Sequence, residues 1–417
     1  MKTLAIIAEY NPFHNGHKYH IQKAKELTGA SHVIVIMSGN FVQRGTPAII
    51  DKYCRTHMAL CEGADIVIEL PYTAALSSAK DFAYTAVGML CSMGCVSHLV
   101  FGSECNNLPL LNTITDILTD ESIQFKNALS HYLKAGLTYP KARYLAVCEE
   151  MQDKTVENVL NMPNNILGIE YLCALKELNS TITPYTILRS DSGYLDHNLS
   201  TGDFSSALAI RNDMTQGTNS LYQKYIPHNA AQILNNYITD NSVLIENDFS
   251  QLLYSKLAYI LSKENNIDLF LAYQDVNEDI ANSIKNNFST FNSFTDFSTT
   301  LKSKNYTKTR IDRILMHILL ECTKEHINTT RNTGFGKLLG FNKSASSILR
   351  KIQDESSFKI ITKSADAEKI LTPQELSLYT QGISNDNAYY YINYQKSIIA
   401  KKSCIRHNEI TRNIIIN

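Results

Sequence analysis

Two histidines flank a glycine near the amino end of the chain, in the run EYNPFHNGHKYH over residues 9–20. His14 and His17 are three residues apart, and Gly16 between them lacks a side chain, so the backbone there can approach a ligand closely. Imidazole N–H groups donate hydrogen bonds to phosphate and stabilise charge that develops at an attacked phosphorus atom. His20 follows one helical turn after His17 and adds to the same face. The run therefore predicts a site for the phosphates of a nucleotide.

The elements around this run indicate how it is positioned. Residues 3–8 form an apolar run typical of a buried strand, and residues 17–27 have helical periodicity. Further strands are predicted at residues 32–37, 65–70, 97–101 and 183–188, with helices between them. This alternation favours a parallel sheet, in which ligands bind at the carboxyl ends of the strands. The histidine loop therefore joins a strand to the N-terminus of a helix, whose unpaired N–H groups suit phosphate.

Length and composition set the wider organisation. With 417 residues, 44% of them hydrophobic, the chain is long enough for two or three domains with sizeable cores. We predict an α/β, Rossmann-like parallel-sheet domain over residues 1–200, with a mainly helical insertion at 106–160. A connecting segment at 201–240, a helical basic region at 241–350 and a small mixed region at 351–417 are predicted to follow.

Charge and cysteine content exclude several classes of protein. The formal net charge is -1, so any contact with nucleic acid must come from a local basic patch. The nine cysteines form no CxxC pair, which disfavours a zinc cage and a disulfide framework, and no protein-bound metal is predicted. No apolar run reaches the roughly 18 residues that span a membrane. We therefore expect a cytoplasmic protein without membrane contact.

One segment of the second half is strongly basic. Between residues 301 and 351, eleven Lys and Arg residues stand against three Asp and Glu residues. Basic side chains at short spacings near an aromatic ring suit an RNA backbone and a stacked base. The predicted RNA contacts, which become tRNA contacts under the family resemblance described below, are Lys304, Tyr306, Lys308, Arg310 and Arg313.

Several motifs together carry a family resemblance. The HxGH loop after a first strand resembles the nucleotidylyltransferase superfamily, whose fold is shared with class I aminoacyl-tRNA synthetases. The segments NPFHNGH, SGNFVQRG, GADIVIELP, FGSE and NNILGIEYL occur in this order. Together they resemble the bacterial tRNA(Met) cytidine acetate ligase family over most of the chain, most densely in residues 1–190.

The resemblance implies an activity and a set of ligands. ATP would activate acetate as acetyl-adenylate, and the acetyl group would pass to N4 of the wobble cytidine of elongator tRNA(Met). ATP, with Mg²⁺ carried by the nucleotide, is the implied cofactor, and His14 and His17 are the implied catalytic residues. The positions that match the family's ATP contacts are Ile7, Ala8, Glu9, Tyr10, Asn11, Pro12, Phe13, His14, Asn15, Gly16, His17, Lys18, Tyr19, His20, Gly102, Asn164 and Arg189.

The outlying members of this set also have structural interpretations. Gly102 follows a strand, where a small residue lets the adenosine pack closely. Asn164 is either the N-cap of the next helix or a ligand of adenine or ribose. Arg189 ends a strand and suits phosphate or adenine stacking, or else a surface salt bridge. Arg44 and Lys52 follow the second strand and are further candidates for contact with substrate or pyrophosphate.

Two other functions remain open at this point. A small-molecule adenylyltransferase of cofactor biosynthesis would explain the HxGH loop but leaves the basic segment without a role. Its usual second phosphate motif, ISSTxxR, does not occur, which counts against it. A catalytically silent RNA-binding protein would explain the basic segment but not the loop. The run 341–346 faintly resembles the KMSKS signature and is discounted because it lies outside the predicted α/β domain.

Overall fold

The computed structural model describes residues 2–153, 155–189, 198–216, 221–331 and 334–417. Within these ranges, one mostly parallel sheet has the strand order β10-β8-β5-β2-β1-β6-β7, and β9 pairs with β8. The five parallel strands of the first half are β1 (Thr3–Ala8), β2 (His32–Ser38), β5 (Ile66–Leu70), β6 (His98–Ser103) and β7 (Thr183–Leu188). The strands predicted from the sequence are therefore confirmed, with ends that differ by a residue or two. A short hairpin, β3 (Phe41–Val42) and β4 (Thr46–Pro47), follows β2.

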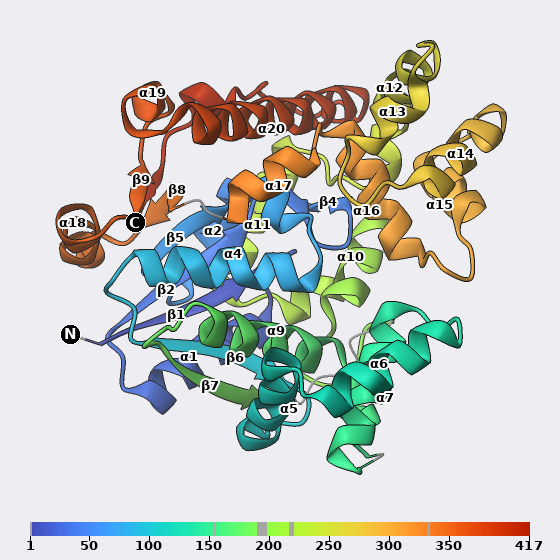
Figure 1. Cartoon of the computed structure of the whole chain (residues 1–417). Coiled ribbons are helices and arrows are strands. Elements are labelled where there is room, and N and C mark those ends of the chain that lie inside the picture. Colours follow the sequence, from blue (N-terminus) through green and yellow to red (C-terminus); the bar gives the residue numbers. More distant parts are fainter. Residues whose placement is uncertain (1, 154, 190–197, 217–220, 332–333) are drawn as a thin grey trace.

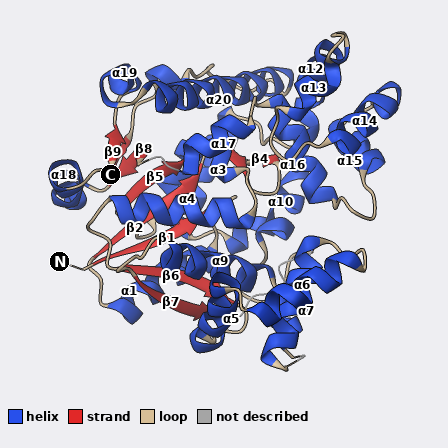
Figure 2. Ribbon diagram, viewed as in Figure 1, coloured by secondary structure: helices blue, strands red, loops and turns tan. Residues whose placement is uncertain are grey.

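Side chains alternate between the two faces of this sheet because strand residues point to opposite sides in turn. Val33 and Val35 of β2 pack into one core, whereas Ile34 and Ile36 pack into the other. Helices cover both faces (Figures 1 and 2). The helices of the first half are α1 (Asn15–Thr28), α2 (Lys52–Cys61), α3 (Tyr72–Ala75), α4 (Ala79–Ser92), α5 (Leu108–Asp120), α6 (Ile123–Lys134), α7 (Tyr139–Met151), α8 (Val156–Leu160) and α9 (Pro163–Glu177).

Helices dominate the second half, as the sequence predicts. They are α10 (Ala207–Gln216), α11 (His228–Asp240), α12 (Ser250–Leu261), α13 (Asn266–Leu271), α14 (Glu278–Asn287), α15 (Phe294–Leu301), α16 (Lys308–Leu319), α17 (Lys324–Arg331), α18 (Ser346–Glu355), α19 (Ala367–Ile370) and α20 (Pro373–Ile399). Figure 1 shows α20 running along the upper side of the molecule, with α12 to α15 beyond one of its ends. No helix within the described ranges combines the length and apolar character needed to cross a membrane.

The sheet does not end at residue 200. β8 (Phe335–Phe341) adds antiparallel to β5, and β9 (Lys359–Ile361) and β10 (Ile415–Ile416) pair with β8. β8 lies in the region that the sequence predicts to be helical, so this strand was missed, because its partner β5 lies far away in the sequence. β9 and β10 lie in the region 351–417, which was predicted to be mixed. The division at residue 200 itself stays a prediction.

The location of the KMSKS-like run also changes. Phe341 ends β8 and pairs with Ile66 at the amino end of β5. The run 341–346 therefore begins inside the sheet, contrary to the reason given for discounting it. The run lies at the amino ends of the parallel strands. A ligand site at their carboxyl ends therefore still excludes it.

A buried ionic cluster joins the C-terminal region to the sheet. Nζ of Lys52, on α2, lies 2.7 Å from Glu69 Oε2, 2.5 Å from Asp386 Oδ2 and 2.9 Å from Glu409 Oε1. Lys337 on β8 also pairs with Glu409. Burial tends to lower the pKa of Lys52, but the three carboxylates outweigh it and hold that pKa well above its ordinary value. Asp386 lies on α20, so the cluster links elements from both halves of the chain.

Replacing the shared cation should destabilise the whole fold. We expect Lys52→Met to lower the free energy of unfolding by about 3–5 kcal/mol, because buried carboxylates lose their counter-charge. Chemical denaturation followed by circular dichroism measures this. Lys23→Met is the matched control, since Lys23 pairs with Glu26 on the exposed face of α1 and should change stability little. Equal losses in the two variants would contradict the role given to the cluster.

Candidate nucleotide-binding site

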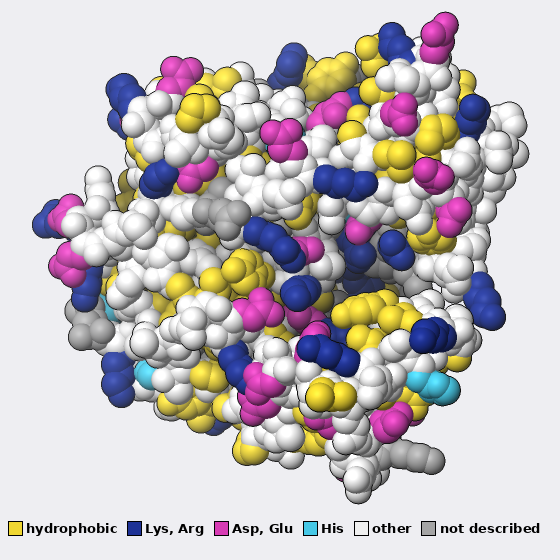
Figure 3. Space-filling view, in the orientation of Figure 1, with side chains coloured by type: hydrophobic (Ala, Val, Ile, Leu, Met, Phe, Trp, Pro, Cys, Tyr) yellow, Lys and Arg dark blue, Asp and Glu magenta, His cyan; other side chains and the backbone are white. Residues whose placement is uncertain are grey.

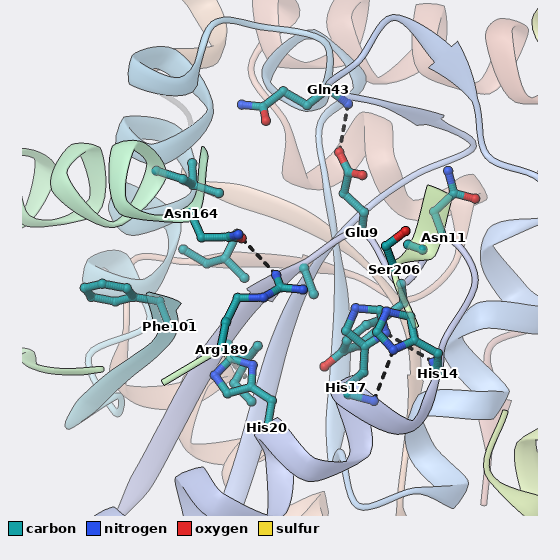
Figure 4. Close-up of a pocket in the computed structure, with 18 of the residues that line it drawn as sticks. Glu9, Asn11, His14, His17, His20, Gln43, Phe101, Asn164, Arg189 and Ser206 are labelled. Atoms are coloured by element: carbon teal, nitrogen blue, oxygen red, sulfur yellow. Dashed lines mark hydrogen bonds between the residues drawn. The ribbon is translucent and has the colours of Figure 1, made fainter. Parts of the chain in front are cut away.

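One large cavity opens at the carboxyl ends of β1, β6 and β7 (Figure 4). The empty space within it is about 1430 Å³ when the open mouth is included. Most of the sequence-predicted ATP contacts line it. They are Ile7, Ala8, Glu9, Tyr10, Asn11, His14, Gly16, His17, Tyr19, His20, Gly102, Asn164 and Arg189.

The two histidines of the loop cap helix α1 with their own rings. The Gly16 N–H donates to Nδ1 of His14 at 3.1 Å, and the His14 N–H donates to Nδ1 of His17 at 3.2 Å. The rings stack with centroids 3.7 Å apart. Because each Nδ1 accepts a backbone hydrogen bond, the proton of each neutral ring is on Nε2. Each imidazole can therefore offer an Nε2–H donor to a ligand beside the helix N-terminus.

The imidazoles are neutral at neutral pH. Burial, and then the charges of Arg189 and Arg211, lowers the pKa of His14 to about 3. Burial, His14 and Arg189 hold the pKa of His17 well below its ordinary value. Burial and Arg189 lower the pKa of His20 to about 4. The positive charge of the cavity therefore comes from the arginines that line it, Arg44, Arg189 and Arg211, and the histidines act as uncharged donors.

The residues at the β6 and β7 ends form a connected group. A Cβ on Gly102 would lie 2.9 Å from Cγ of Arg189, so the missing side chain makes room for the arginine stem. Nη1 of Arg189 donates to Asn164 Oδ1 at 2.8 Å, as Figure 4 shows. Nδ2 of Asn164 donates to Glu104 Oε1 at 2.7 Å. Arg189 is thus held over the cavity, which favours the ligand-binding interpretation.

Asn164 is not the N-cap that the sequence allowed. Helix α9 begins at Pro163 with Met162 as its N-cap, whose side chain makes no capping bond. Glu104 caps the helix instead: its carboxylate accepts the backbone N–H groups of Asn164 at 3.0 Å and Asn165 at 2.8 Å. A carboxylate is stabilising at this end of a helix. The Asn164 side chain is therefore free of capping and turns to Arg189.

Four members of the predicted stretch are not among the described residues that line the cavity. Phe13 is fully buried in the core, and Pro12 precedes it. The Asn15 amide donates to two backbone carbonyl groups of the segment between β7 and α11. Nζ of Lys18 pairs with Glu62 at 2.9 Å. These positions shape the loop, because neighbouring residues in a turn and helix point to different sides.

Ser206, just before α10, and Arg211, within it, line the cavity although they are not in the predicted set. Nη1 of Arg211 donates to the Asn11 carbonyl at 2.7 Å, beside the histidine loop. The strict ISSTxxR motif is absent, yet these residues keep the spacing of its first serine and its arginine. That spacing ahead of a helix was the signal that could have found them. The missing motif therefore no longer counts against an adenylyltransferase.

The two candidates that follow β2, Arg44 and Lys52, have different locations in the fold. Gln43 and Arg44 line the cavity from the β3–β4 hairpin. Lys52 does not: it is fully buried in the ionic cluster, and its role is structural. A Cβ on Gly45, whose φ is +76°, would lie 2.3 Å from the backbone nitrogen of Arg313. Helix α16 therefore packs its backbone directly on this hairpin.

The predicted tRNA contacts lie around the start of α16. Lys304 is exposed, and the Arg310 guanidinium stacks 4.8 Å from the ring centre of Tyr306. Nζ of Lys308 pairs with Asp312 at 2.9 Å. Arg313 differs, because its side chain is only 18% exposed and lies 3.9 Å from Asp275. Figure 3 shows Lys and Arg side chains gathered around a hollow right of centre, where Figure 1 places α10 and α16.

Comparisons with known proteins agree with this geometry. A family described as HIGH Nucleotidyl Transferase matches residues 1–403. A tRNA(Met) cytidine acetate ligase of Thermoanaerobacter sp. (strain X514) is 40% identical over 411 residues, covering 96% of this chain and 97% of the relative. One of Acetivibrio thermocellus is 34% identical over 426 residues, covering both chains fully.

Solved structures give the same result. The crystal structure of Thermotoga maritima TmcAL without ligand has a TM-score of 0.92 at 29% identity, covering 100% of this chain and 99% of that one. The same protein bound with alpha-thio ATP has a TM-score of 0.89 at 28% identity, with the same coverage. The sequence relatives and the fold therefore place this chain in the tRNA(Met) cytidine acetate ligase family.

Proposed function

We propose that this chain activates acetate with ATP, forms acetyl-adenylate, and acetylates N4 of the wobble cytidine of elongator tRNA(Met), releasing AMP and pyrophosphate. The observation that carries the proposal is the cavity in which the stacked His14 and His17, Arg189 and Arg211 converge beside the N-terminus of α1. The full-length relatives named for this activity support the choice of acetate and tRNA(Met).

The donors of the cavity suit attack at the α-phosphate. An acetate oxygen forms a bond to phosphorus, the bond to the bridging oxygen breaks, and pyrophosphate leaves with the electron pair. The Nε2–H groups of His14 and His17 donate to phosphate oxygens as negative charge develops there. The Arg211 guanidinium, held at the Asn11 carbonyl, adds fixed positive charge. A preorganised set of donors stabilises the transition state because it need not reorient.

The binding of Mg²⁺ is expected to follow the nucleotide. The wall around His14, His17 and Arg211 presents N–H donors and guanidinium charge, which suit phosphate oxygens and do not suit a cation. Mg²⁺ commonly keeps its waters and binds substrate phosphates. We therefore propose that it is held by the ATP phosphates, whose charge it neutralises.

The tRNA is proposed to approach over α16. Helix α16 packs on the hairpin that carries Gln43 and Arg44, so a bound RNA there lies next to the cavity. Lys304 and Arg310 would contact phosphates, and the Tyr306–Arg310 stack offers a flat surface to a base. A wobble cytidine is already exposed in an anticodon loop, so little unstacking free energy is needed for it to enter the cavity.

The principal alternative is a small-molecule adenylyltransferase of cofactor biosynthesis, which the Ser206–Arg211 spacing keeps open. ATP–pyrophosphate exchange separates the two. Exchange that requires acetate, followed by acetyl transfer to a tRNA(Met) transcript, supports the proposal. Exchange that ignores acetate and responds to a phosphorylated cofactor precursor supports the alternative. The cytoplasmic location remains an expectation consistent with a tRNA substrate.

The Nε2–H donor of His14 can be tested apart from its capping role. Asparagine is a good N-cap with a shorter side chain, so His14→Asn should keep α1 intact while withdrawing the Nε2–H donor from the phosphates. We expect acetate-dependent ATP–pyrophosphate exchange to fall about 10²–10³-fold, as when one oxyanion donor is lost. Thermal denaturation checks that the variant is folded. His14→Ala, which also removes the cap, should lose stability as well. Exchange within tenfold of wild type in His14→Asn would rule out the donor role.

The basic surface can be tested by comparing exposed and buried cations. Lys304→Ala and Arg310→Ala should weaken tRNA(Met) binding and flatten its dependence on salt, because phosphate contacts are lost. Arg313→Ala should instead lower stability, because it leaves Asp275 without its partner. Filter binding at several salt concentrations measures the first effect, and denaturation the second. The surface is misassigned if Arg313→Ala folds normally and loses more tRNA affinity than Lys304→Ala.

A further inference from the structure

Among the described residues that line the cavity, Glu9 is the only one with a carboxylate. It directly follows β1, which lies between β2 and β6 in the sheet. Its side chain therefore stands at the point where the strand order changes direction, the usual place for reacting groups in such sheets. Figure 4 shows its carboxyl group on the side of Gln43, away from His14 and His17.

The position of Glu9 is fixed by two neighbours. Its backbone carbonyl accepts a hydrogen bond from Nη1 of Arg55 at 2.6 Å, and Arg55 is fully buried. The backbone N–H of Gln43 donates to its Oε1 at 3.0 Å. Oε2 makes no hydrogen bond to any residue in the described part of the chain. The carboxylate is thus oriented through one oxygen and keeps the other as an acceptor facing the cavity.

Acyl transfer from acetyl-adenylate requires such an acceptor. The attacking amino nitrogen forms a bond to the carbonyl carbon, and the bond from that carbon to the adenylate oxygen breaks. AMP leaves with the electron pair, and the nitrogen must lose one proton. On the basis of the proposed function, we propose that Glu9 is the general base that accepts this proton and later releases it to solvent.

The other basic groups of the cavity are poorly placed for this task. A proton on His14 or His20 would add a positive charge beside Arg189, and burial already lowers the pKa of both rings. Nδ1 of His14 and Nδ1 of His17 each accept a backbone hydrogen bond, and each Nε2 carries the ring proton, so neither ring has an open lone pair. Oε2 of Glu9 has one, which leaves the carboxylate as the acceptor. Glu9 acts after the adenylate has formed, so its loss should affect the two half-reactions unequally.

Glu9→Gln tests this directly, because it removes the basicity and keeps the size of the side chain. Acetate activation is measured as ATP–pyrophosphate exchange. Transfer is measured in single turnovers with synthetic acetyl-adenylate and a tRNA(Met) transcript. We expect transfer to fall at least 100-fold and exchange less than tenfold. Glu9→Asp, which keeps a carboxylate, should restore part of the transfer rate.

Glu104→Gln is the matched control, since it neutralises a carboxylate on the nucleotide side that holds Asn164. It should raise KM for both ATP and acetyl-adenylate, so that both half-reactions are affected alike. Equal losses of exchange and transfer in Glu9→Gln would overturn the inference, because Glu9 would then serve ATP or its metal. An unchanged transfer rate would also overturn it. A wild-type protein that performs neither half-reaction refutes the proposed function instead.

Discussion

A single buried guanidinium fixes the geometry from which the site is built. Arg55 lies on α2 with no exposed surface, and its donors reach the backbone carbonyls of Ile50, Glu9, Ser38 and Gly39. These carbonyl groups lie at or after the carboxyl ends of β1 and β2, where the hydrogen bonds between neighbouring strands stop. Buried carbonyl groups need a hydrogen-bond partner, and one planar cation supplies it for all four. The two loops can therefore diverge from the sheet and still be held rigidly.

The C-terminal half is attached to this region by charge as well as by apolar packing. The Lys52 cluster lies one helical turn before Arg55 on α2 and draws in Asp386 from α20 and Glu409. Burial raises the pKa of Asp386, whereas Lys52 and Lys337 overcome the opposing effect of burial and lower the pKa of Glu409. The cluster keeps the last strands and α20 on the sheet.

In the cavity, hydrogen-bond donors and positive charge are supplied by different side chains. Neutral imidazoles in the α1 cap offer directional donors, and arginines from β7 and α10 supply the positive field. This division has a physical reason. A protonated imidazole could not keep its Nδ1 as an acceptor for the backbone, so charging His14 or His17 would break the cap of α1. Among the described residues that line the cavity, the one carboxylate is that of Glu9, which points away from the two histidines (Figure 4).

The sequence by itself determined the parallel strands of the first half and the HxGH loop with its helix, because local periodicity and spacing depend on residues near in sequence. Gly102, Asn164 and Arg189 were predicted from the family resemblance, and only the fold brings them to one cavity. The tertiary structure also decided that β8 completes the sheet, that Lys52 is a structural cation and that Glu9 has an open oxygen. Ser206 and Arg211 keep a spacing that the sequence shows, but their place in the cavity depends, like these other outcomes, on contacts between segments far apart in the chain.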